Sequence, residues 1–237
     1  RSPSNQRGPS LSAPTRPDRR LETVPADRLH LVRHGEVHNP RRVLYGRLPG
    51  FGLSVDGRRM ARQAAEYVHG LDRPVGALVV SPLQRTRESA EPFVGLFGIE
   101  PFIDDRVIEP TNVFEGRRMK KALATPLNWR HLSRPAVPSW GEPYERIVAR
   151  MTEAMTDAWD RVPSGDVVVV SHQLPIWVTH LALSQQPTRH DPRKRRCALS
   201  SVTSFERRDG AAGSSRWIEV AYAEPAATAG AVDVGAV

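Results

Sequence analysis

Residues 31–36 read Leu-Val-Arg-His-Gly-Glu, and this stretch carries the clearest indication of the fold. The apolar run at 29–32 is typical of a short buried strand, and such strands usually have helices on both faces. Arg33, His34 and Gly35 follow it directly. Ligands of open α/β sheets bind just beyond the carboxyl ends of the strands. The stretch therefore predicts an α/β sheet with a functional site at a strand end.

The residues that follow this run are suited to bind and attack a phosphorylated group. Arg33 has a planar, permanently charged donor fork that matches phosphate oxygens. His34 can attack phosphorus through a neutral ring nitrogen near physiological pH. Gly35 has no side chain, so we expect the backbone there to approach an anion closely. For this tripeptide alone, a solvated arginine and a hydrogen-bonded histidine remain the alternative.

Two further apolar runs, residues 75–80 and 166–170, also lead into polar residues. The first is followed by Ser-Pro-Leu-Gln-Arg, which ends at Arg85. Proline is tolerated in the first turn of a helix, so we expect Arg85 in that turn, where the helix dipole favours an anion. The second run is followed by Ser171 and then His172.

Glu109 closes another extended apolar segment. Each of these residues has a simpler interpretation when taken singly. Arg85, with Arg87 beside it, could be a surface charge. His172 could be bonded to the backbone, and Glu109 could simply end a strand. Because these features would all have to coincide at strand ends by chance, we interpret them together as one site.

These motifs resemble those of the histidine phosphatase superfamily, which has the phosphoglycerate-mutase-like fold. The resemblance extends over about residues 28–223 and rests on Arg33-His34-Gly35, Ser81-Pro82-Leu83-x-Arg85 and Val170-Ser171-His172. It implies hydrolysis of phosphomonoesters without a metal or other cofactor, through a phosphohistidine on His34. It further implies that Arg33, Arg85 and His172 hold the phosphoryl oxygens and that Glu109 donates the proton.

The chain departs from the family pattern near the nucleophile. Val37 and Pro40 stand where the family usually has threonine and asparagine, and Asn39 lies one position before Pro40. Gln173 stands where glycine typically follows the second histidine. We expect Asn39, Gln173 and Arg47 to contribute to substrate binding, with Arg47 near a second anionic group.

Two segments are expected to form the walls of the pocket. Residues 45–50 should form one wall, and the long connection at 111–140 should shape the leaving-group side, as long loops often do. His131 in this connection is an unassigned candidate ligand, for which loop packing is the simpler interpretation. Known mutases of the family tend to carry Thr-Gly-Trp where this chain has Tyr-Gly-Arg at 45–47, which favours a phosphatase. Mutase-type transfer and a non-catalytic phosphate-binding scaffold remain the alternatives.

The composition is that of one globular domain. The 237 residues are 39% apolar and 25% charged, which is sufficient for a single α/β core. Cys197 is the single cysteine, so an intrachain disulfide is excluded, and we expect it to be buried at the start of a strand. The sequence has no run of about 18 apolar residues, which a membrane span would need. Arg19-Arg20 could suggest a twin-arginine export signal, but no apolar segment follows it, so we expect a cytoplasmic protein.

The formal net charge is +8, with one dense basic cluster at 193–196. No aromatic residues are interleaved with this cluster, so we interpret it as a solvated loop rather than a nucleic-acid site. The positive field instead favours a small phosphorylated metabolite as the partner. Residues 43–53 and an exposed strand near Trp217 are candidate interfaces for a homodimer.

The chain is predicted to form a single three-layer α/β domain at 28–223, with a mostly parallel sheet and helices on both faces. Residues 1–27 and 224–237 lack apolar periodicity and are predicted to be disordered. Amphipathic spacing predicts helices after Ser54 and over 142–161 and 175–183. Strands are expected near 201–206 and 217–222.

Overall fold

A six-stranded sheet with strand order β3-β2-β4-β1-β5-β6 forms the centre of the molecule. The computed structural model describes residues 26–126, 141–209 and 215–226. The strands are β1 (Leu29–Arg33), β2 (Val75–Val80), β3 (Pro101–Ile103), β4 (Asp166–Ser171), β5 (Val202–Asp209) and β6 (Ser215–Ala223). The helices are α1 (Val55–His69), α2 (Gln84–Phe97), α3 (Met119–Leu123), α5 (Tyr144–Arg161) and α6 (Gln173–Leu183), with the short 3-10 helices η1 (Asp105–Val107) and η3 (Pro192–Lys194).

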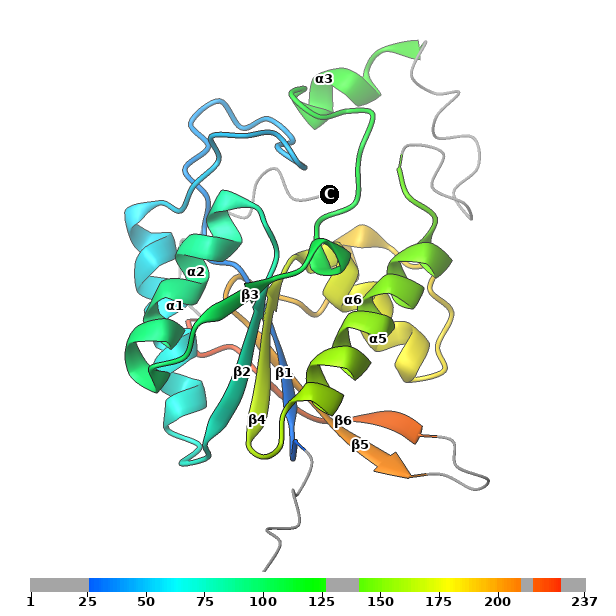
Figure 1. The fold of residues 1–237 in the computed structure, drawn as a ribbon. Helices are drawn as coiled ribbons and strands as arrows, with labels where there is room; N and C mark the ends of the chain where they lie inside the picture. The colour runs from blue at the N-terminus through cyan, green and yellow to red at the C-terminus, as the bar shows by residue number, and fades with distance from the viewer. Residues whose placement is uncertain (1–25, 127–140, 210–214, 227–237) are drawn as a thin grey trace, which may run out of the picture.

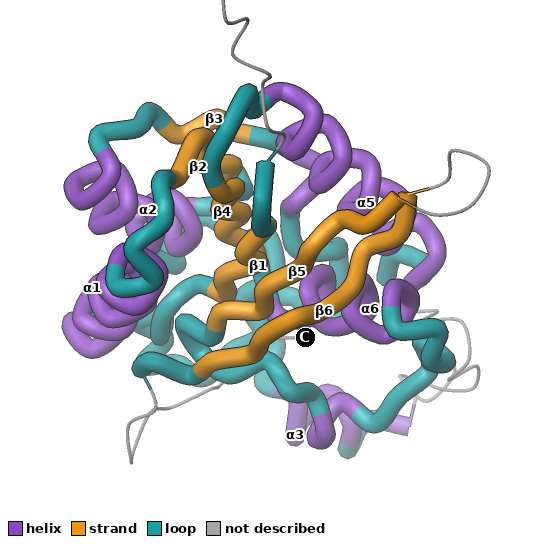
Figure 2. The backbone as a smooth tube through the Cα atoms, turned by 90° about the horizontal axis from the view of Figure 1, so that it is seen from below, coloured by secondary structure: helices purple, strands orange, loops and turns teal. Residues whose placement is uncertain are grey.

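The sheet is parallel through β3, β2, β4 and β1. Strand β5 pairs antiparallel with β1, and β6 pairs antiparallel with β5, so that the two form a ribbon at one edge (Figure 2). Helices α1 and α2 cover one face of the sheet, and α5 and α6 cover the other (Figure 1). The predicted three-layer fold with a mostly parallel sheet is confirmed.

Alternate residues of the buried strands pack against different helical layers. On β4, Val167 belongs to the core cluster on the side of α5 and α6, whereas Val168 belongs to the cluster on the side of α1 and α2. On β1, Leu31 and Val32 divide in the same way. A strand with a helical layer on each face needs apolar side chains in both directions. The uninterrupted apolar runs of the sequence therefore mark the centre of the sheet.

The predicted helices are present, with shifted starts. Ser54 caps α1 as expected, since its hydroxyl accepts a hydrogen bond from the Gly57 amide at 2.9 Å. Helix α5 begins only at Tyr144, because Pro143 has an extended conformation and forms its N-cap. Helix α6 begins at Gln173, two residues before Pro175, because the first turn of a helix tolerates a residue without an amide hydrogen.

One expectation for the C-terminal part is wrong, and another holds only in part. Cys197 is buried, but it lies in the connection before β5, which begins only at Val202. Trp217 itself is 5% exposed and packs edge-on against Trp159, with ring centroids 5.1 Å apart, whereas Arg216 and Val220 of the same edge strand are exposed. Because β6 is an edge strand whose inner face lies over α5, a large aromatic there extends the core.

The parallel register ends β1, β2 and β4 at the same level. Val170 of β4 pairs with Val32 on one side and with Val80 on the other. The His34 amide then donates to the Ser171 carbonyl at 3.1 Å, which continues the ladder by one residue. The side chains that follow the strands are those of His34, Ser81 and His172.

A buried polar network ties the strands together near the start of β4. The His30 ring lies 3.1 Å from Asp166 Oδ2 through Nε2 and 2.8 Å from the Ser204 hydroxyl through Nδ1. Arg73 donates to both oxygens of Asp166, at 2.8 and 3.0 Å. Burial raises the pKa of Asp166, but the hydrogen bonds from His30 and Arg73 outweigh it, so the net pKa lies below its usual value. The carboxylate thus links β1, β4 and β5.

Several sequence-based expectations fall on residues that the structure does not describe. The segments predicted to be disordered lie almost entirely in 1–25 and 227–237, and His131 lies in 127–140; these are outside the described residues. None of the helices in the described part of the chain is long and apolar enough to cross a membrane.

Replacing Asp166 by asparagine should lower the free energy of unfolding by about 3 kcal/mol at pH 7, because it removes the buried negative charge that Arg73 and His30 contact. The depressed pKa means that the carboxylate contributes stability above about pH 4 and loses it as the pH falls further. Urea unfolding at several pH values should therefore show the difference between wild type and Asp166→Asn narrowing towards pH 3. The exposed pair Arg59–Asp56 provides the control, since Asp56→Asn should cost under about 1 kcal/mol.

Candidate active site

His34 stands directly after β1 and is almost completely buried, with 1% of its surface exposed. Its Nδ1 lies 2.8 Å from the carbonyl oxygen of Gly35, which accepts a hydrogen bond from it. That bond fixes the tautomer and leaves Nε2 with a lone pair. Burial lowers the pKa of His34 well below its usual value, and the charges of Arg85 and Arg33 lower it further. The ring is therefore neutral and can act as a nucleophile.

Gly35 is needed for a reason that differs from the one expected. A Cβ built on Gly35 would lie 2.3 Å from the carbonyl oxygen of Gly57, and one built on Gly57 would lie 1.9 Å from that of Glu36. The two glycines thus let the segment after β1 pack directly on the first turn of α1. The Gly35 amide donates to the Ser89 hydroxyl at 3.1 Å. What requires this glycine is the close packing of backbone on backbone.

Two buried guanidinium groups lie close enough to His34 for their charges to lower its pKa. Arg33 is fully buried, and its Nη1 donates to the Cys197 carbonyl at 2.6 Å. Arg85 is 1% exposed, donates through Nη2 to the Gly46 carbonyl at 2.9 Å and stacks over the Tyr45 ring at 4.8 Å. Burying two cations is costly unless an anion compensates them. The pair is therefore suited to hold a dianionic phosphoryl group.

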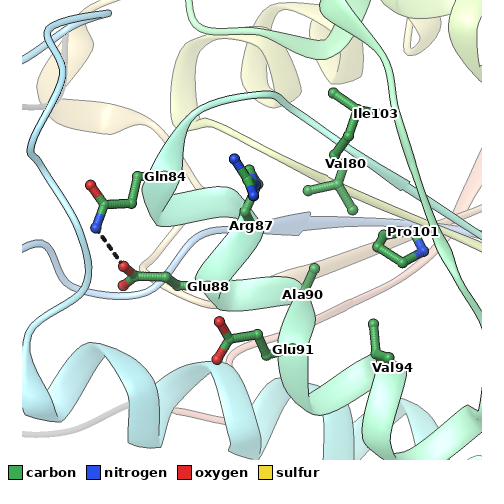
Figure 3. A pocket seen from close by; sticks show the side chains of 9 residues that line it. All are labelled: Val80, Gln84, Arg87, Glu88, Ala90, Glu91, Val94, Pro101 and Ile103. Carbon is green, nitrogen blue, oxygen red and sulfur yellow. Dashed lines mark hydrogen bonds between the residues drawn. The ribbon is translucent and has the colours of Figure 1, made fainter.

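Arg85 and Arg87 have different surroundings, so the surface-charge interpretation of Arg85 is wrong. Arg85 is the second residue of α2, as expected, although Pro82 lies before this helix instead of within its first turn. Arg87 is exposed and lines an open groove of about 410 Å³ between α2 and β3 (Figure 3). Gln84 in the same groove donates to Glu88 at 2.7 Å. None of the predicted site residues lines this groove.

His172 and Glu109 complete the cluster. The rings of His34 and His172 have centroids 5.2 Å apart. His172 Nε2 lies 2.8 Å from the Ser81 hydroxyl, and its Nδ1 lies 3.4 Å from Glu109 Oε2. Burial lowers the pKa of His172 well below its usual value, and Arg85 adds to the effect. In the unliganded protein His172 is therefore a neutral ring and does not add a third positive charge to those of Arg33 and Arg85.

Glu109 does not end a strand, contrary to expectation. Strand β3 stops at Ile103, and the 3-10 helix η1 turns the chain before it reaches Glu109. The side chain is nonetheless buried at the strand ends, and burial raises its pKa although nearby arginines, Arg85 first, oppose this. A carboxyl group with a raised pKa can be protonated at neutral pH and can donate its proton.

Some buried polar atoms of the cluster have no hydrogen-bond partner among the described residues. They include Nε of Arg85, Nδ1 of His172 and Oε1 of Glu109. Leaving such an atom unsatisfied costs about 1–3 kcal/mol, so several in one place indicate that a ligand provides the missing bonds. No three His, Cys, Asp or Glu side chains within the described ranges form a group that could hold a metal ion.

The remaining predicted residues lie in different places. Arg47 reaches the acid, because its Nε donates to the Glu109 carbonyl at 2.5 Å. Gln173 donates through Nε2 to the Cys197 carbonyl at 3.3 Å, the same oxygen that binds Arg33. The Asn39 side chain instead bonds both the amide and the carbonyl of Val43, and so holds the loop 39–43. Arg47 and Gln173 are thus brought to the cluster, whereas the contacts of Asn39 stabilise its own loop.

The two segments predicted as walls are in contact over the site. The Leu44 amide donates to Arg117 at 2.9 Å, and the Gly116 amide donates to Leu44 at 2.7 Å. Glu115 accepts the Arg47 amide at 3.1 Å, and a Cβ on Gly46 would lie 2.1 Å from its carboxylate. Figure 1 shows residues 45–50 and the described part of the second segment, 111–126, beyond the carboxyl ends of the parallel strands.

Sequence reasoning missed two residues of this region. Ser81 was interpreted only as part of a turn, yet its hydroxyl holds His172; its position after a buried strand was the available signal. Arg195 was assigned to a solvated loop, which is wrong: it is half-buried and bonds Gln173 and His190. No local pattern distinguishes Arg195 from its basic neighbours.

Comparison with known proteins agrees with this arrangement. The model of the histidine phosphatase superfamily (branch 1) matches residues 29–219, which include every residue of the cluster. This chain belongs to the histidine phosphatase superfamily. The uncharacterized protein Rv0525 of Mycobacterium tuberculosis H37Rv is 48% identical over 203 residues, covering 84% of this chain and 96% of that protein.

Solved structures of phosphatases have the same fold as this member of the superfamily. The phosphate complex of the mycobacterial glucosyl-3-phosphoglycerate phosphatase Rv2419c has a TM-score of 0.68 and 25% identity, and covers 86% of this chain and 100% of that one. Phosphoserine phosphatase from Entamoeba histolytica has a TM-score of 0.66 and 20% identity over 82% of this chain and 95% of that one. Family and neighbours together support phosphoester hydrolysis or phosphoryl transfer in general.

The depressed pKa values of His34 and His172 predict that both rings stay neutral at pH 6 in the unliganded protein. NMR of ¹⁵N-histidine-labelled protein should show neutral-ring nitrogen shifts for both residues, with signals assigned by their loss in His34→Gln and His172→Gln. For His34 the pattern should report a proton on Nδ1. A titration midpoint near 6.5 for either ring would contradict the prediction.

Proposed function

We propose that this histidine phosphatase hydrolyses phosphomonoesters through a phosphohistidine on His34, with Glu109 as general acid and then general base. The observation that carries the proposal is the arrangement of His34 itself. Its Nδ1 is held by Gly35, its Nε2 has the lone pair, and the charges of the buried Arg85 and Arg33 act on the ring. A neutral nucleophile near two fixed cations is suited to attack on a phosphate dianion.

In the first step, His34 Nε2 forms a bond to phosphorus while the bond from phosphorus to the ester oxygen breaks. Arg33 and Arg85 stabilise the charge on the non-bridging oxygens through charge-assisted hydrogen bonds. Glu109 gives its proton to the departing oxygen, so that a neutral alcohol leaves and a carboxylate remains. The raised pKa of Glu109 keeps the group protonated until substrate has bound.

In the second step, the Glu109 carboxylate takes a proton from water as the water oxygen attacks phosphorus. The bond between His34 and phosphorus breaks, inorganic phosphate forms, and Glu109 is protonated again. His172, held by Ser81, lies between the nucleophile and the acid. Its ring provides a hydrogen bond to a phosphoryl oxygen, and the bound dianion raises its pKa relative to that of the empty site.

The substrate we propose is a small phosphorylated metabolite. The support comes from the family match and from a phosphatase as a 25%-identical structural relative. The positive net charge of +8 favours the approach of anionic compounds.

The variant His34→Ala should lose phosphate release from simple phosphomonoesters by a factor of about 10³ or more, because no other group can form the covalent intermediate. Brief reaction of the wild type with ³²P-labelled ester should trap an acid-labile, base-stable phosphoprotein, and the variant should not be labelled. The exposed His69, replaced by alanine, is the matched control and should leave turnover unchanged.

Comparing the rate of phosphoryl exchange with the rate of phosphate release distinguishes transfer from hydrolysis. If exchange between the two monophosphoglycerates, started with bisphosphoglycerate, equals or exceeds phosphate release, the enzyme is a mutase and hydrolysis is a side reaction. If His34→Ala releases phosphate at the wild-type rate, the proposed mechanism is wrong.

Glu109→Gln should lower kcat for alkyl phosphates by about 10²–10⁴, because the alcohol then leaves without a proton. With p-nitrophenyl phosphate, whose leaving group needs no proton, the variant should release a burst of about one nitrophenolate per enzyme and then slow down, since water lacks its base. In the wild type, kcat/KM for alkyl phosphates should fall as the pH rises through the raised pKa of Glu109. Equal loss on both substrates without a burst would exclude this role.

A further inference from the structure

The three arginines of the cluster at 193–196 contact different partners. Arg193 is exposed and pairs with Asp191 at 2.8 Å. Arg196 pairs with Glu219 at 2.5 Å and stacks over the Tyr222 ring at 4.5 Å. Arg195 is half-buried, and its contacts lead towards the active site. This one residue of the basic loop therefore needs a separate explanation.

Arg195 is connected to the phosphate-binding residues by a short series of hydrogen bonds. Its Nη1 donates to Gln173 Oε1 at 3.2 Å. Gln173 is the residue after His172, and its Nε2 donates to the Cys197 carbonyl at 3.3 Å. The same carbonyl accepts Arg33 Nη1 at 2.6 Å. One glutamine side chain and one carbonyl thus separate the Arg195 guanidinium from that of Arg33.

Arg195 is connected to the acid as well. Gln173, whose Oε1 accepts a hydrogen bond from Arg195, directly follows His172, and His172 Nδ1 lies 3.4 Å from Glu109 Oε2. The positive charge of Arg195 also lowers the pKa of Glu109, against the rise that burial causes. Glu109 is the group that meets the ester oxygen in the proposed reaction. Arg195 is therefore placed to meet what is attached to that oxygen.

Two neutral side chains help to orient Arg195. Gln173 has no charge, and burial lowers the pKa of His190, whose Nε2 receives the Arg195 Nε–H at 2.9 Å. The His190 ring in turn packs on Tyr144, with ring centroids 5.6 Å apart. These two hydrogen bonds hold the guanidinium without placing a negative charge against it. A fixed cation in a half-buried position is a suitable binding group for an anion.

We propose that Arg195, oriented by Gln173 and His190, forms a second anion subsite that binds a carboxylate or second phosphate on the leaving group. The inference rests on the proposed phosphatase function and deepens it by naming the substrate class. Preferred substrates are phosphomonoesters whose alcohol part carries its own negative charge. Arg195 is a specificity-determining residue; the phosphoryl group itself is held elsewhere.

Two chemically matched pairs of compounds test this subsite. 3-Phosphoglycerate and glycerol 3-phosphate differ only in a carboxylate against a CH₂OH group, and fructose 1,6-bisphosphate and fructose 6-phosphate differ in a second phosphate. Each is measured as a substrate and as a competitive inhibitor of p-nitrophenyl phosphate hydrolysis. The wild type should favour the more anionic member of at least one pair by about tenfold or more, and the pair concerned identifies the anion.

Arg195→Gln should remove most of that preference. We expect it to weaken binding of the member with the second anionic group about tenfold, and to change binding of the member without that group by less than about threefold. The effect should lie mainly in KM, and Arg195→Lys should restore part of it. Arg193→Gln removes a charge from the same loop without touching the site, so it is the matched control and should retain the preference.

Three results would overturn the inference. If Arg195→Gln weakens both members of each pair equally, Arg195 only supports the structure. If the wild type hydrolyses p-nitrophenyl phosphate through His34 but shows no preference in either pair, the subsite does not exist and the proposed function stands. If the wild type hydrolyses no ester, the proposed function fails. Calorimetric binding of 3-phosphoglycerate and glycerol 3-phosphate to wild type and Arg195→Gln then decides the subsite by itself, and equal affinities would overturn it.

Discussion

Strands β1 and β4 pair in parallel from Leu29 with Val167 to Arg33 with Ser171, and this register determines where the functional groups lie. Because β2 pairs with the other side of β4 in the same direction, all three strands end at one level. The side chains that follow them must then share one small volume. A shift of the β1–β4 register by one residue would turn every side chain of β1 to the opposite layer, so the buried faces protect the geometry of the site. Packing of the two apolar layers thereby positions the polar side chains at the strand ends, which take no part in that packing.

Burial then sets the chemical state of those groups. Removing His34 and His172 from water lowers their pKa values, and removing Glu109 from water raises its pKa. All three changes favour neutral side chains, so the arginines provide the net charge of the empty site. Such a site attracts a dianion strongly and has the nucleophile and the acid in the protonation states that they need. The electrostatic cost of burying Arg33 and Arg85 is offset when substrate binds.

The segments around the strand ends adapt this shared arrangement to one class of substrate. Loop 43–48 and residues 112–117 are joined by backbone hydrogen bonds, and Arg47 reaches from this pair to the Glu109 carbonyl. On another side, Gln173 occupies the position where the family usually has glycine, and it orients Arg195. The departure from the family pattern at Gln173 is thus structurally linked to the proposed anion subsite. In the proposed reaction, the residues that bind the phosphoryl group come from strand ends, whereas those around the leaving group come from loops.

The sequence by itself determined the layers and most of the cluster. Uninterrupted apolar runs identify strands buried on both faces, and the residues after those runs identify Arg33, His34, Arg85 and His172, because strand ends are local features. Tertiary structure alone decided the rest. It showed that Glu109 follows a 3-10 turn instead of a strand, that Gly35 packs on Gly57, and that Arg195 bonds Gln173 while Arg193 pairs with Asp191. Local periodicity reports whether a side chain is buried, but the partner of a loop residue depends on contacts between segments far apart in the chain.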